Sequence, residues 1–449
     1  MTARLPWTVR WRLSILWALQ WGITGTILTY LPLYLTQSGL DAEQQGQLMA
    51  VTAVGLWFAP LLVGQVADRW LATERYLALS HFVGGVTLMC IPHATLGFQE
   101  TNDNFLILLF LVGLYSVAYF PTVALASSLS FRHLSDPESQ FGHVRVWGTV
   151  GWMLAGLSLS VWLGQADALN WLRDHLPYAA GLWFNLGLFL DWLPAPSSSD
   201  CFRMAAVLSF ALSSFCVFLP HTPPVPQSRR RFAPLEVLKM FQDRTFTLLI
   251  LISFLLSLVV PLYTLQVPKL LDQLGFENDW IPAVMLIGQI SEFPALFLLP
   301  LFLKKFGLKT TFAIGMAAWL VRYVFFAFEQ PWMLILFGLA LHGVCHVFLI
   351  IVIQLFVDSR CKPDVRASAQ NLFTFVTMGV GMPLGSIIGG KLGQWWFDID
   401  SGRTNYLGLF SLPAVFIFTL LLIYWKWFNF QPAAAVGPAA IQREGGDET

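Results

Sequence analysis

Charged side chains are scarce in this 449-residue chain. They account for 12% of the residues, whereas 56% are hydrophobic, and an average soluble domain carries about 25% charged residues. A soluble globular fold is therefore disfavoured. The 26 basic and 26 acidic residues cancel, so the overall charge gives no indication of a nucleic-acid partner.

Short motifs that bind metals or phosphates are also missing. The five cysteines show no C-x-x-C spacing, so we expect neither a disulfide framework nor a metal site. No G-x-x-x-x-G-K-[ST] loop is present, which argues against ATP-driven transport by this chain alone. The sequence indicates no cofactor, and it contains no cluster of catalytic groups typical of an enzyme.

What the chain does contain is a series of long apolar runs. A bilayer-spanning helix needs about 20 predominantly apolar residues, and runs of roughly this length are separated by charged or Gly- and Pro-rich breaks. We therefore predict an all-α polytopic membrane protein with 12 transmembrane helices in two six-helix halves, a known transporter plan. The predicted spans are 13–35, 46–66, 76–96, 104–130, 143–163, 203–220, 245–266, 281–303, 310–328, 332–356, 367–391 and 406–428.

A segment rich in proline and arginine divides the chain. Residues 221–244 cannot enter hydrocarbon and are interpreted as a cytoplasmic linker. The N-terminal half is therefore residues 1–220 and the C-terminal half is residues 245–430. Residues 431–449 are rich in Ala and Gly and are expected to be a disordered tail.

Residues 178–192 are apolar but only about 15 residues long, which is short for a membrane span. Lys and Arg accumulate on the cytoplasmic side of membrane proteins. With twelve spans, 20 of the 26 Lys and Arg residues fall on the side of the N-terminus and five on the other, whereas a thirteenth span would move one basic half outside. We therefore predict that 178–192 belongs to an outer loop, 164–202, of an inner (plasma) membrane protein with both termini cytoplasmic.

Glu292 is the clearest ionisable residue at predicted membrane depth. Such residues are costly in lipid and are functional candidates by default. Gln289 precedes Glu292 by one helical turn and shares its face. Glu292 could bind and release the proton that couples transport, and the structural alternative is a carboxylate bonded to Gln289 or to a neighbouring helix.

Two arginines also fall in predicted spans. Arg322, in the ninth span, could neutralise Glu292 or could extend its charge to the interface, and a structural role is slightly favoured. Arg145, near the start of the fifth span, is either an anchor at the lipid headgroups or a cation that orients substrate in a central cavity.

His342 and His346 lie four residues apart and share a helix face, a spacing that can bind metal. The sequence shows no third ligand clustered with them, so a packed, hydrogen-bonded pair is the favoured interpretation. His346 is also a candidate to face the cavity. Five aromatic residues near polar positions could stack on a flat ligand, namely Trp17, Trp21, Tyr119, Phe120 and Trp147.

Five stretches spread over both halves form a recognisable set. They are AYFPT (Ala118 to Thr122), VRVWGTVG (Val144 to Gly151), QISE (Gln289 to Glu292), AWLVRYVFFAF (Ala318 to Phe328) and VRASAQ (Val365 to Gln370). In this order they resemble the nucleoside/proton symporter family of the major facilitator superfamily. The resemblance implies import of nucleosides with the proton gradient, and a central cavity lined by Arg145, Thr149, Gln289 and Glu292.

The chain departs from the family pattern at three positions. Pro261 and Thr264 stand where the family has amide side chains in the seventh span. Val347, next to His346, stands where the family has a buried carboxylate in the tenth span. The resemblance therefore adds Thr264 and His346 to the substrate-binding candidates, and it leaves the contacts to ribose and base open.

The leading hypothesis is a secondary transporter that imports nucleosides by proton symport through alternating access. The alternative within the same class is a proton-coupled carrier of sugars or other small polar metabolites. A membrane-embedded enzyme using His342 and His346, or a sensor that binds without transporting, is the alternative from another class. The expected partners are the small polar substrate, a proton and the lipid bilayer, with no nucleic acid, and a monomer is compatible with the plan.

Overall fold

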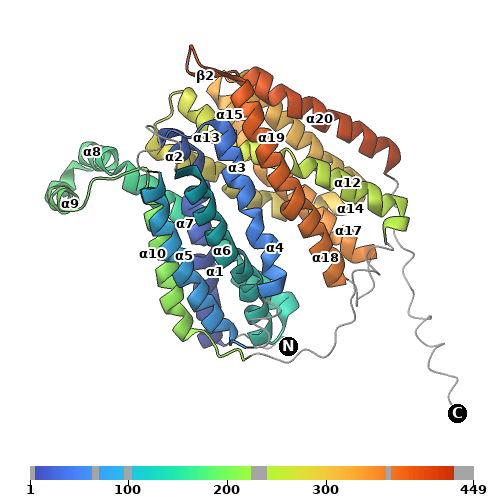
Figure 1. Cartoon of the computed structure of the whole chain (residues 1–449), viewed down its shortest axis with the longest axis horizontal. Coiled ribbons are helices and arrows are strands. Elements are labelled where there is room, and N and C mark those ends of the chain that lie inside the picture. The colour runs from blue at the N-terminus through green and yellow to red at the C-terminus, as the bar shows by residue number, and fades with distance from the viewer. Residues whose placement is uncertain (1–5, 63–69, 96–103, 224–239, 361–365, 429–449) are drawn as a thin grey trace.

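The computed structural model describes residues 6–62, 70–95, 104–223, 240–360 and 366–428. Within these ranges the chain is almost entirely helical, as predicted, and nine helical segments are long and apolar enough to cross a bilayer. One of them contains two spans, and the helices that precede residue 63 run alongside the others (Figure 1). The arrangement is consistent with the predicted twelve spans.

The N-terminal half forms a bundle in which α1 packs along α7 and α10, and α5 packs along α6 and α10 (Figure 1). Small residues allow the closest approach, because a Cβ atom at Gly151 would lie 2.1 Å from the carbonyl oxygen of Ala18. The helices are α1 (Trp7–Leu28), α2 (Leu31–Gln37), α3 (Ala42–Val51), α4 (Ala53–Leu62), α5 (Thr73–Ala94), α6 (Phe105–His133), α7 (Pro137–Leu163) and α10 (Asp200–Phe215).

The C-terminal half repeats the helical plan, and two of its spans contain π-helical turns. Turns of this kind often occur at functional sites. The elements are α12 (Arg244–Ser257), α13 (Val260–Gln273), α14 (Ile281–Phe328), α15 (Trp332–Ala340), α16 (His342–His346), the π-turn η7 (Val347–Ile351), α17 (Val352–Arg360), α18 (Arg366–Thr374), the π-turn η8 (Phe375–Gly381), α19 (Met382–Trp395), the short hairpin β1 (Phe397–Asp398) and β2 (Arg403–Thr404), and α20 (Tyr406–Trp427).

Helix α14 contains two spans joined by a sharp reversal. Its 48 residues would extend about 72 Å if straight, far beyond the hydrocarbon thickness of about 30 Å. Gly307 breaks the helix with φ 73°, a left-handed conformation that glycine adopts without steric cost. Glu292 and Arg322 both lie beside His342, although a straight helix would hold them about 45 Å apart. The chain therefore folds back at Gly307, which matches the predicted eighth and ninth spans.

The segment predicted as an outer loop forms two helices that stand beside the bundle. These are α8 (Gln165–His175) and α9 (Ala180–Trp192), joined by a short turn (Figure 1). With 13 residues, α9 is about 20 Å long, too short to cross the hydrocarbon. Tyr178 and Trp192 are 84% and 79% exposed. The prediction did not decide whether this segment is helical, and the structure shows that it is.

The two halves contact each other at the end of the bundle that carries α8, α9 and the β1–β2 hairpin (Figure 1). There Ser160 of α7 accepts a hydrogen bond from the backbone N–H of Ala283 at 2.9 Å. Helices α3 and α19 approach so closely that a Cβ atom at Gly46 would lie 2.4 Å from the carbonyl oxygen of Ser386. Close backbone packing therefore joins the halves at this end.

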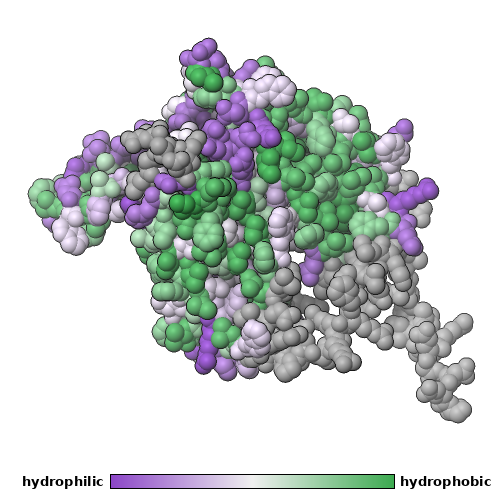
Figure 2. Space-filling view, in the orientation of Figure 1, coloured by the Kyte–Doolittle hydropathy of each residue, from purple (hydrophilic) through white to green (hydrophobic). Residues whose placement is uncertain are grey.

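The flanks of the bundle are hydrophobic, as a lipid-facing surface requires. Figure 2 shows green, hydrophobic side chains along the helices and purple, hydrophilic ones at the end with α8 and the hairpin. Large apolar side chains such as Phe297, Phe110 and Val415 are more than 60% exposed, as expected where lipid replaces water. Most of the predicted linker, residues 224–239, and the whole predicted tail, residues 431–449, lie outside the described part of the chain.

Candidate functional site

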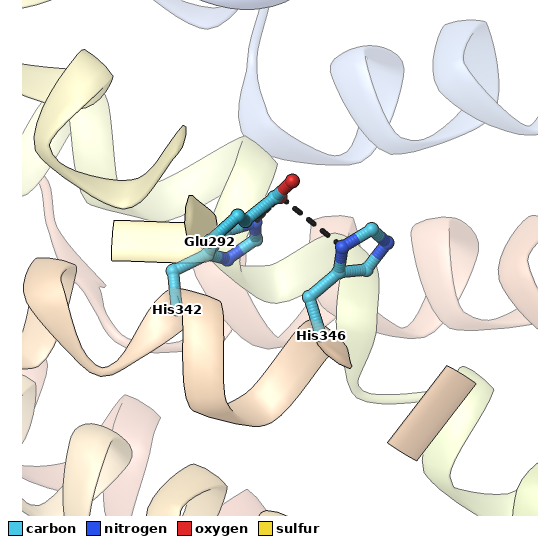
Figure 3. A group of neighbouring side chains, drawn as sticks. All are labelled: Glu292, His342 and His346. Atoms are coloured by element: carbon cyan, nitrogen blue, oxygen red, sulfur yellow. Dashed lines mark ion pairs between the residues drawn. The ribbon is translucent and has the colours of Figure 1, made fainter. Parts of the chain in front are cut away.

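Glu292 lies about halfway along the first span of α14 and is flanked by two histidines of α16 (Figure 3). Its Oε1 is 3.1 Å from Nδ1 of His346 and 3.4 Å from Nε2 of His342. The two imidazole rings are nearly parallel, with centroids 5.6 Å apart. The predicted partner Gln289 is not among the groups that contact the Glu292 carboxylate in the described residues. The histidines take that place.

A glycine allows the histidines to reach Glu292. Gly343 sits between them in sequence, and a Cβ atom there would lie 2.1 Å from the carbonyl oxygen of Ser291. The backbone N–H of Gly343 donates to Oγ of Ser291 at 2.8 Å. Helix α16 thus lies directly against α14 beside Glu292. The π-turn η7 begins at the residue after His346.

Arg322, on the second span of α14, is fully buried at 0% exposure. Its Nη1 lies 3.1 Å from Nδ1 of His342, and its Cζ is 3.6 Å from the ring centre of Tyr263 on α13. The possibility that Arg322 extends to the interface was therefore wrong. Its charge is held inside the bundle by an aromatic face, and it reaches Glu292 only through His342.

Arg322 determines the tautomer of His342. A guanidinium can only donate hydrogen bonds, so Nδ1 of His342 must be the unprotonated, accepting nitrogen. The proton of the neutral ring is then on Nε2, the nitrogen that faces the Glu292 carboxylate. Arg322, His342 and Glu292 therefore form a chain in which a neutral imidazole separates a permanent cation from a carboxylate.

The three residues Glu292, His342 and His346 have the composition of a metal site. One ligand atom from each lies within 4.8 Å of the others, so the expectation that no third ligand accompanies the histidines was wrong. A metal would need the lone pair of His342 Nε2, which carries the proton while Arg322 donates to Nδ1. The adjacent guanidinium also repels a divalent cation. The geometry therefore favours proton chemistry over metal binding.

Arg145 lies on α7 of the N-terminal half and packs on two tryptophans. Its Cζ lies 4.8 Å and 4.6 Å from the ring centres of Trp17 and Trp21, one turn apart on α1. The side chain is half-buried, and Glu292 of the other half lies on α14, against which α7 packs. Thr149 follows one turn later on α7 and is also half-buried. Both predicted residues thus lie on a helix that packs against α14.

Gln289 and Thr264 remain near the cluster without joining it. The amide oxygen of Gln289 is buried and has no hydrogen-bond partner among the described residues, so it is available to a ligand. Thr264 is half-buried on α13, immediately after the Tyr263 ring that covers Arg322. The side chain of Thr264 therefore leaves α13 in a direction about 100° away from that of Tyr263 around the helix axis.

Most of the aromatic stacking candidates have structural contacts instead. Trp17 is 1% exposed and donates from Nε1 to Oγ of Ser130 at 3.1 Å. The Tyr119 hydroxyl donates to the carbonyl oxygen of Gln20 at 2.6 Å. Trp147 lies two residues after Arg145 and therefore on the opposite side of α7. Trp21 is the best placed of the set, because its ring contacts Arg145 and its buried Nε1 has no partner among the described residues.

Tyr263 was missed by the sequence analysis. It stacks on His342 at 5.4 Å between ring centres and covers Arg322, and its buried hydroxyl has no partner in the described chain. Tyr263 is 29 residues before Glu292 and about 60 before Arg322. No local spacing pattern links residues so far apart, so only the folded bundle reveals the contact.

A comparison with family models identifies the chain. The model of the nucleoside H+ symporters matches residues 7–201 and 195–433, nearly the whole sequence. The chain belongs to the nucleoside H+ symporter family. The proteins of this family are transporters and not enzymes, which removes the enzyme alternative and agrees with the resemblance found in the motifs.

Relatives in the nucleoside H+ symporter family span almost the full chain. YegT of Escherichia coli (strain K12), named as a nucleoside transporter, is 29% identical over 93% of this chain and 93% of its own. The nucleoside permease NupG of the same organism is 25% identical, over 94% and 96% respectively. Its xanthosine permease is also 25% identical, with the same coverage.

Solved structures of related transporters share this fold. The crystal structure of the nucleoside transporter NupG superposes with a TM-score of 0.76 at 24% identity, over 94% of this chain and all of that one. The crystal structure of a D-xylose–proton symporter gives 0.69 at 12% identity, over 95% and 98%. The predicted fold class, an all-α polytopic membrane protein of the transporter type, is thereby confirmed.

Proposed function

We propose that this protein imports nucleosides by proton symport through alternating access of a central site. The observation that carries the proposal is Glu292, a half-buried carboxylate within the bundle that contacts His342 and His346, and through His342 is linked to Arg322. A buried ionisable group inside a membrane bundle marks a substrate or proton pathway. Membership of the nucleoside H+ symporter family supports the substrate class.

Glu292 is the proposed proton-coupling residue. When it is ionised, it attracts Arg145, which lies on α7, the helix of the N-terminal half that packs against α14, and protonation removes this attraction. The balance between the two alternating conformations then depends on whether the proton is bound. A bound proton can shift the balance between two conformations only if it interacts differently with each of them, and the attraction between Glu292 and Arg145 provides such a difference.

The proposed substrate contacts come from both halves. Arg145 and Thr149 approach from the N-terminal half, and Gln289, Glu292 and Thr264 from the C-terminal half. His346, the remaining candidate, is the most exposed member of the Glu292 cluster. Arg145 and the free amide oxygen of Gln289 provide a donor and an acceptor for hydroxyl and base groups. Trp21, beside Arg145, provides a flat apolar face.

We further propose that residues 1–220 and 245–430 are the two halves that move against each other, joined by the cytoplasmic linker 221–244. An even number of spans places both termini on one side, and the excess of Lys and Arg there indicates the cytoplasm. In an inner membrane, the contacts between α3 and α19 would then close the outer side, and α8 and α9 would lie at the outer interface.

Proton coupling supplies enough free energy for uphill import. Moving one charge across 100 mV is worth about 2.3 kcal/mol. At about 1.4 kcal/mol per tenfold change, this supports roughly 50-fold accumulation of a neutral solute per proton.

Uptake of labelled uridine and adenosine into cells without their own nucleoside carriers tests the proposal. We expect accumulation that a protonophore abolishes, and we expect Glu292→Gln to reduce it to the outside concentration, a loss of roughly 50-fold. Glu277→Gln, at an exposed site in the loop before α14, is the matched control. Undiminished accumulation by the Glu292 variant would refute the coupling role.

The second candidate function is proton-coupled transport of sugars or other small polar solutes. It is favoured by Thr264 and Val347, which replace amide and carboxylate groups of the family pattern. Absence of nucleoside uptake in cells with verified membrane expression, together with competition by unlabelled sugars in a wider screen, would establish this alternative.

A further inference from the structure

His346 is the accessible end of the Glu292 cluster. Its side chain is 44% exposed, compared with 19% for Glu292 and 15% for His342, and Arg322 is fully buried. The order of exposure follows the order of contacts. Arg322 contacts His342, and Glu292 lies between His342 and His346 (Figure 3). A proton that arrives from outside the cluster therefore meets His346 before the other members.

His342 cannot take this proton without losing its contact with Arg322. Its Nε2 already carries a proton, and its Nδ1 accepts from the guanidinium at 3.1 Å. Protonation at Nδ1 would place two donors and two positive charges against each other in a buried site. His346 has no such constraint in the described residues, because its Nδ1 faces a carboxylate.

We propose that His346 receives the transported proton from the cavity and shares it with Glu292, while His342, held neutral by Arg322, positions the carboxylate for this exchange. The inference rests on the proposed function and deepens it, because it places the coupling proton on a pair of residues and not on Glu292 alone. It assigns Arg322 and His342 positioning roles.

The proton moves to Glu292 in two steps, and both protons and charges are accounted for. In the resting state, Nδ1–H of His346 donates to Oε1 of Glu292 and Nε2 is free. A proton from water adds to Nε2, and the Nδ1 proton then moves to the Glu292 oxygen. His346 ends as the neutral Nε2–H tautomer and Glu292 as the neutral acid. The charge of the pair changes from −1 to 0 by one proton, and the reverse steps release it.

The charged and titratable groups around the pair come from each packed element. Arg145 on α7 and Arg322 on α14 are cations that favour ionised Glu292, and His342 is neutral for the reason given above. The Tyr263 hydroxyl on α13 and the Cys345 thiol on α16 are uncharged at neutral pH. Loss of the pair's negative charge therefore weakens its attraction to Arg145, which lies on α7, the helix of the opposite half that packs against α14.

The test compares His346→Gln and His346→Phe with the wild-type carrier in reconstituted vesicles. Gln retains polar groups and Phe retains the ring, but neither binds a proton. His175→Gln, at an exposed histidine of α8, is the matched control. Three quantities are measured: nucleoside counterflow, which needs no net proton movement, accumulation driven by a pH gradient, and the pH profile of uptake.

We expect both His346 variants to retain counterflow within about twofold, to lose at least about tenfold of the roughly 50-fold accumulation, and to show a flattened pH profile. Wild-type accumulation with an unchanged pH profile in either variant would overturn the inference. Loss of counterflow in parallel with accumulation, in properly inserted protein, would also overturn it, because His346 would then be a substrate contact.

Failure of the proposed function gives a different result. In that case wild-type vesicles show no proton-driven nucleoside uptake at all, and the variants are not needed for the conclusion. When the wild type does accumulate nucleoside, the His346 variants alone decide whether the proton is shared.

Discussion

The two halves each bury one arginine against aromatic rings, but they use it differently. Arg145 of the N-terminal half is half-buried, packs on Trp17 and Trp21, and lies opposite the other half. Arg322 of the C-terminal half is fully enclosed by Tyr263 and His342. Arg145 remains available to a ligand, whereas Arg322 determines which ring nitrogen of His342 carries the proton. The N-terminal half thus contributes a constant charge, and the C-terminal half contains the groups that titrate.

The largest expected effect comes from removing the enclosed arginine. Arg322→Met leaves Nδ1 of His342 without a donor and Glu292 without its nearby permanent cation. Breaking a buried charge network of this kind typically costs about 3 kcal/mol or more, so we expect a clear fall in the melting temperature in detergent and loss of proton-driven uptake. Arg322→Lys, which retains a cation, should be less damaging. A melting temperature equal to that of the wild type in the Met variant would contradict the role assigned to Arg322.

A smaller effect is expected where α16 contacts α14. In Gly343→Ala, the new methyl group meets the carbonyl oxygen of Ser291, so the helices must separate and His342 and His346 must move away from Glu292. Overpacking of this kind costs about 1–3 kcal/mol. Thermal unfolding and uptake are the measurements. Gly181→Ala on α9, where a Cβ atom has no neighbour within 4 Å, is the control, and equal behaviour of the two variants would disprove the steric argument.

The smallest effect on stability is expected at the half-buried arginine of the N-terminal half. Arg145→Gln loses cation–π contacts worth about 1 kcal/mol, so the melting temperature should change little. Nucleoside binding should nevertheless weaken at least about tenfold, because a proposed ligand contact is removed. Isothermal titration or counterflow measures this loss. Unchanged binding would mean that Arg145 is a structural anchor, and the contrast with Arg322 would then disappear.

The fold was largely predictable because hydrocarbon imposes a strong constraint. Only long apolar helices can satisfy their backbone hydrogen bonds in lipid, so span positions follow from composition. The break between the eighth and ninth spans was predicted, and the structure places it at Gly307. The helical state of 178–192 was not predicted, because a short apolar segment outside the hydrocarbon has no comparable constraint.

The candidate site was only partly predictable. Glu292 was identified because an acidic residue in an apolar run is costly, and His342 and His346 because they share a helix face. Their meeting was not predicted: the sequence analysis named Gln289 or an unspecified neighbouring helix as possible partners of Glu292, and it gave the two histidines no third ligand. Glu292 and His346 lie 54 residues apart, and their contact depends on the absence of a side chain at Gly343.

The sequence by itself determined the membrane location, the helical class and the scarcity of buried ionisable residues, because the cost of burying charge in lipid acts on each segment separately. Tertiary structure alone decided that Arg322 reaches Glu292 through His342, that Tyr263 covers the guanidinium, and that His346 is the accessible member of the cluster. These relations depend on side-chain directions from three helices at once, and no periodicity along one segment carries that information.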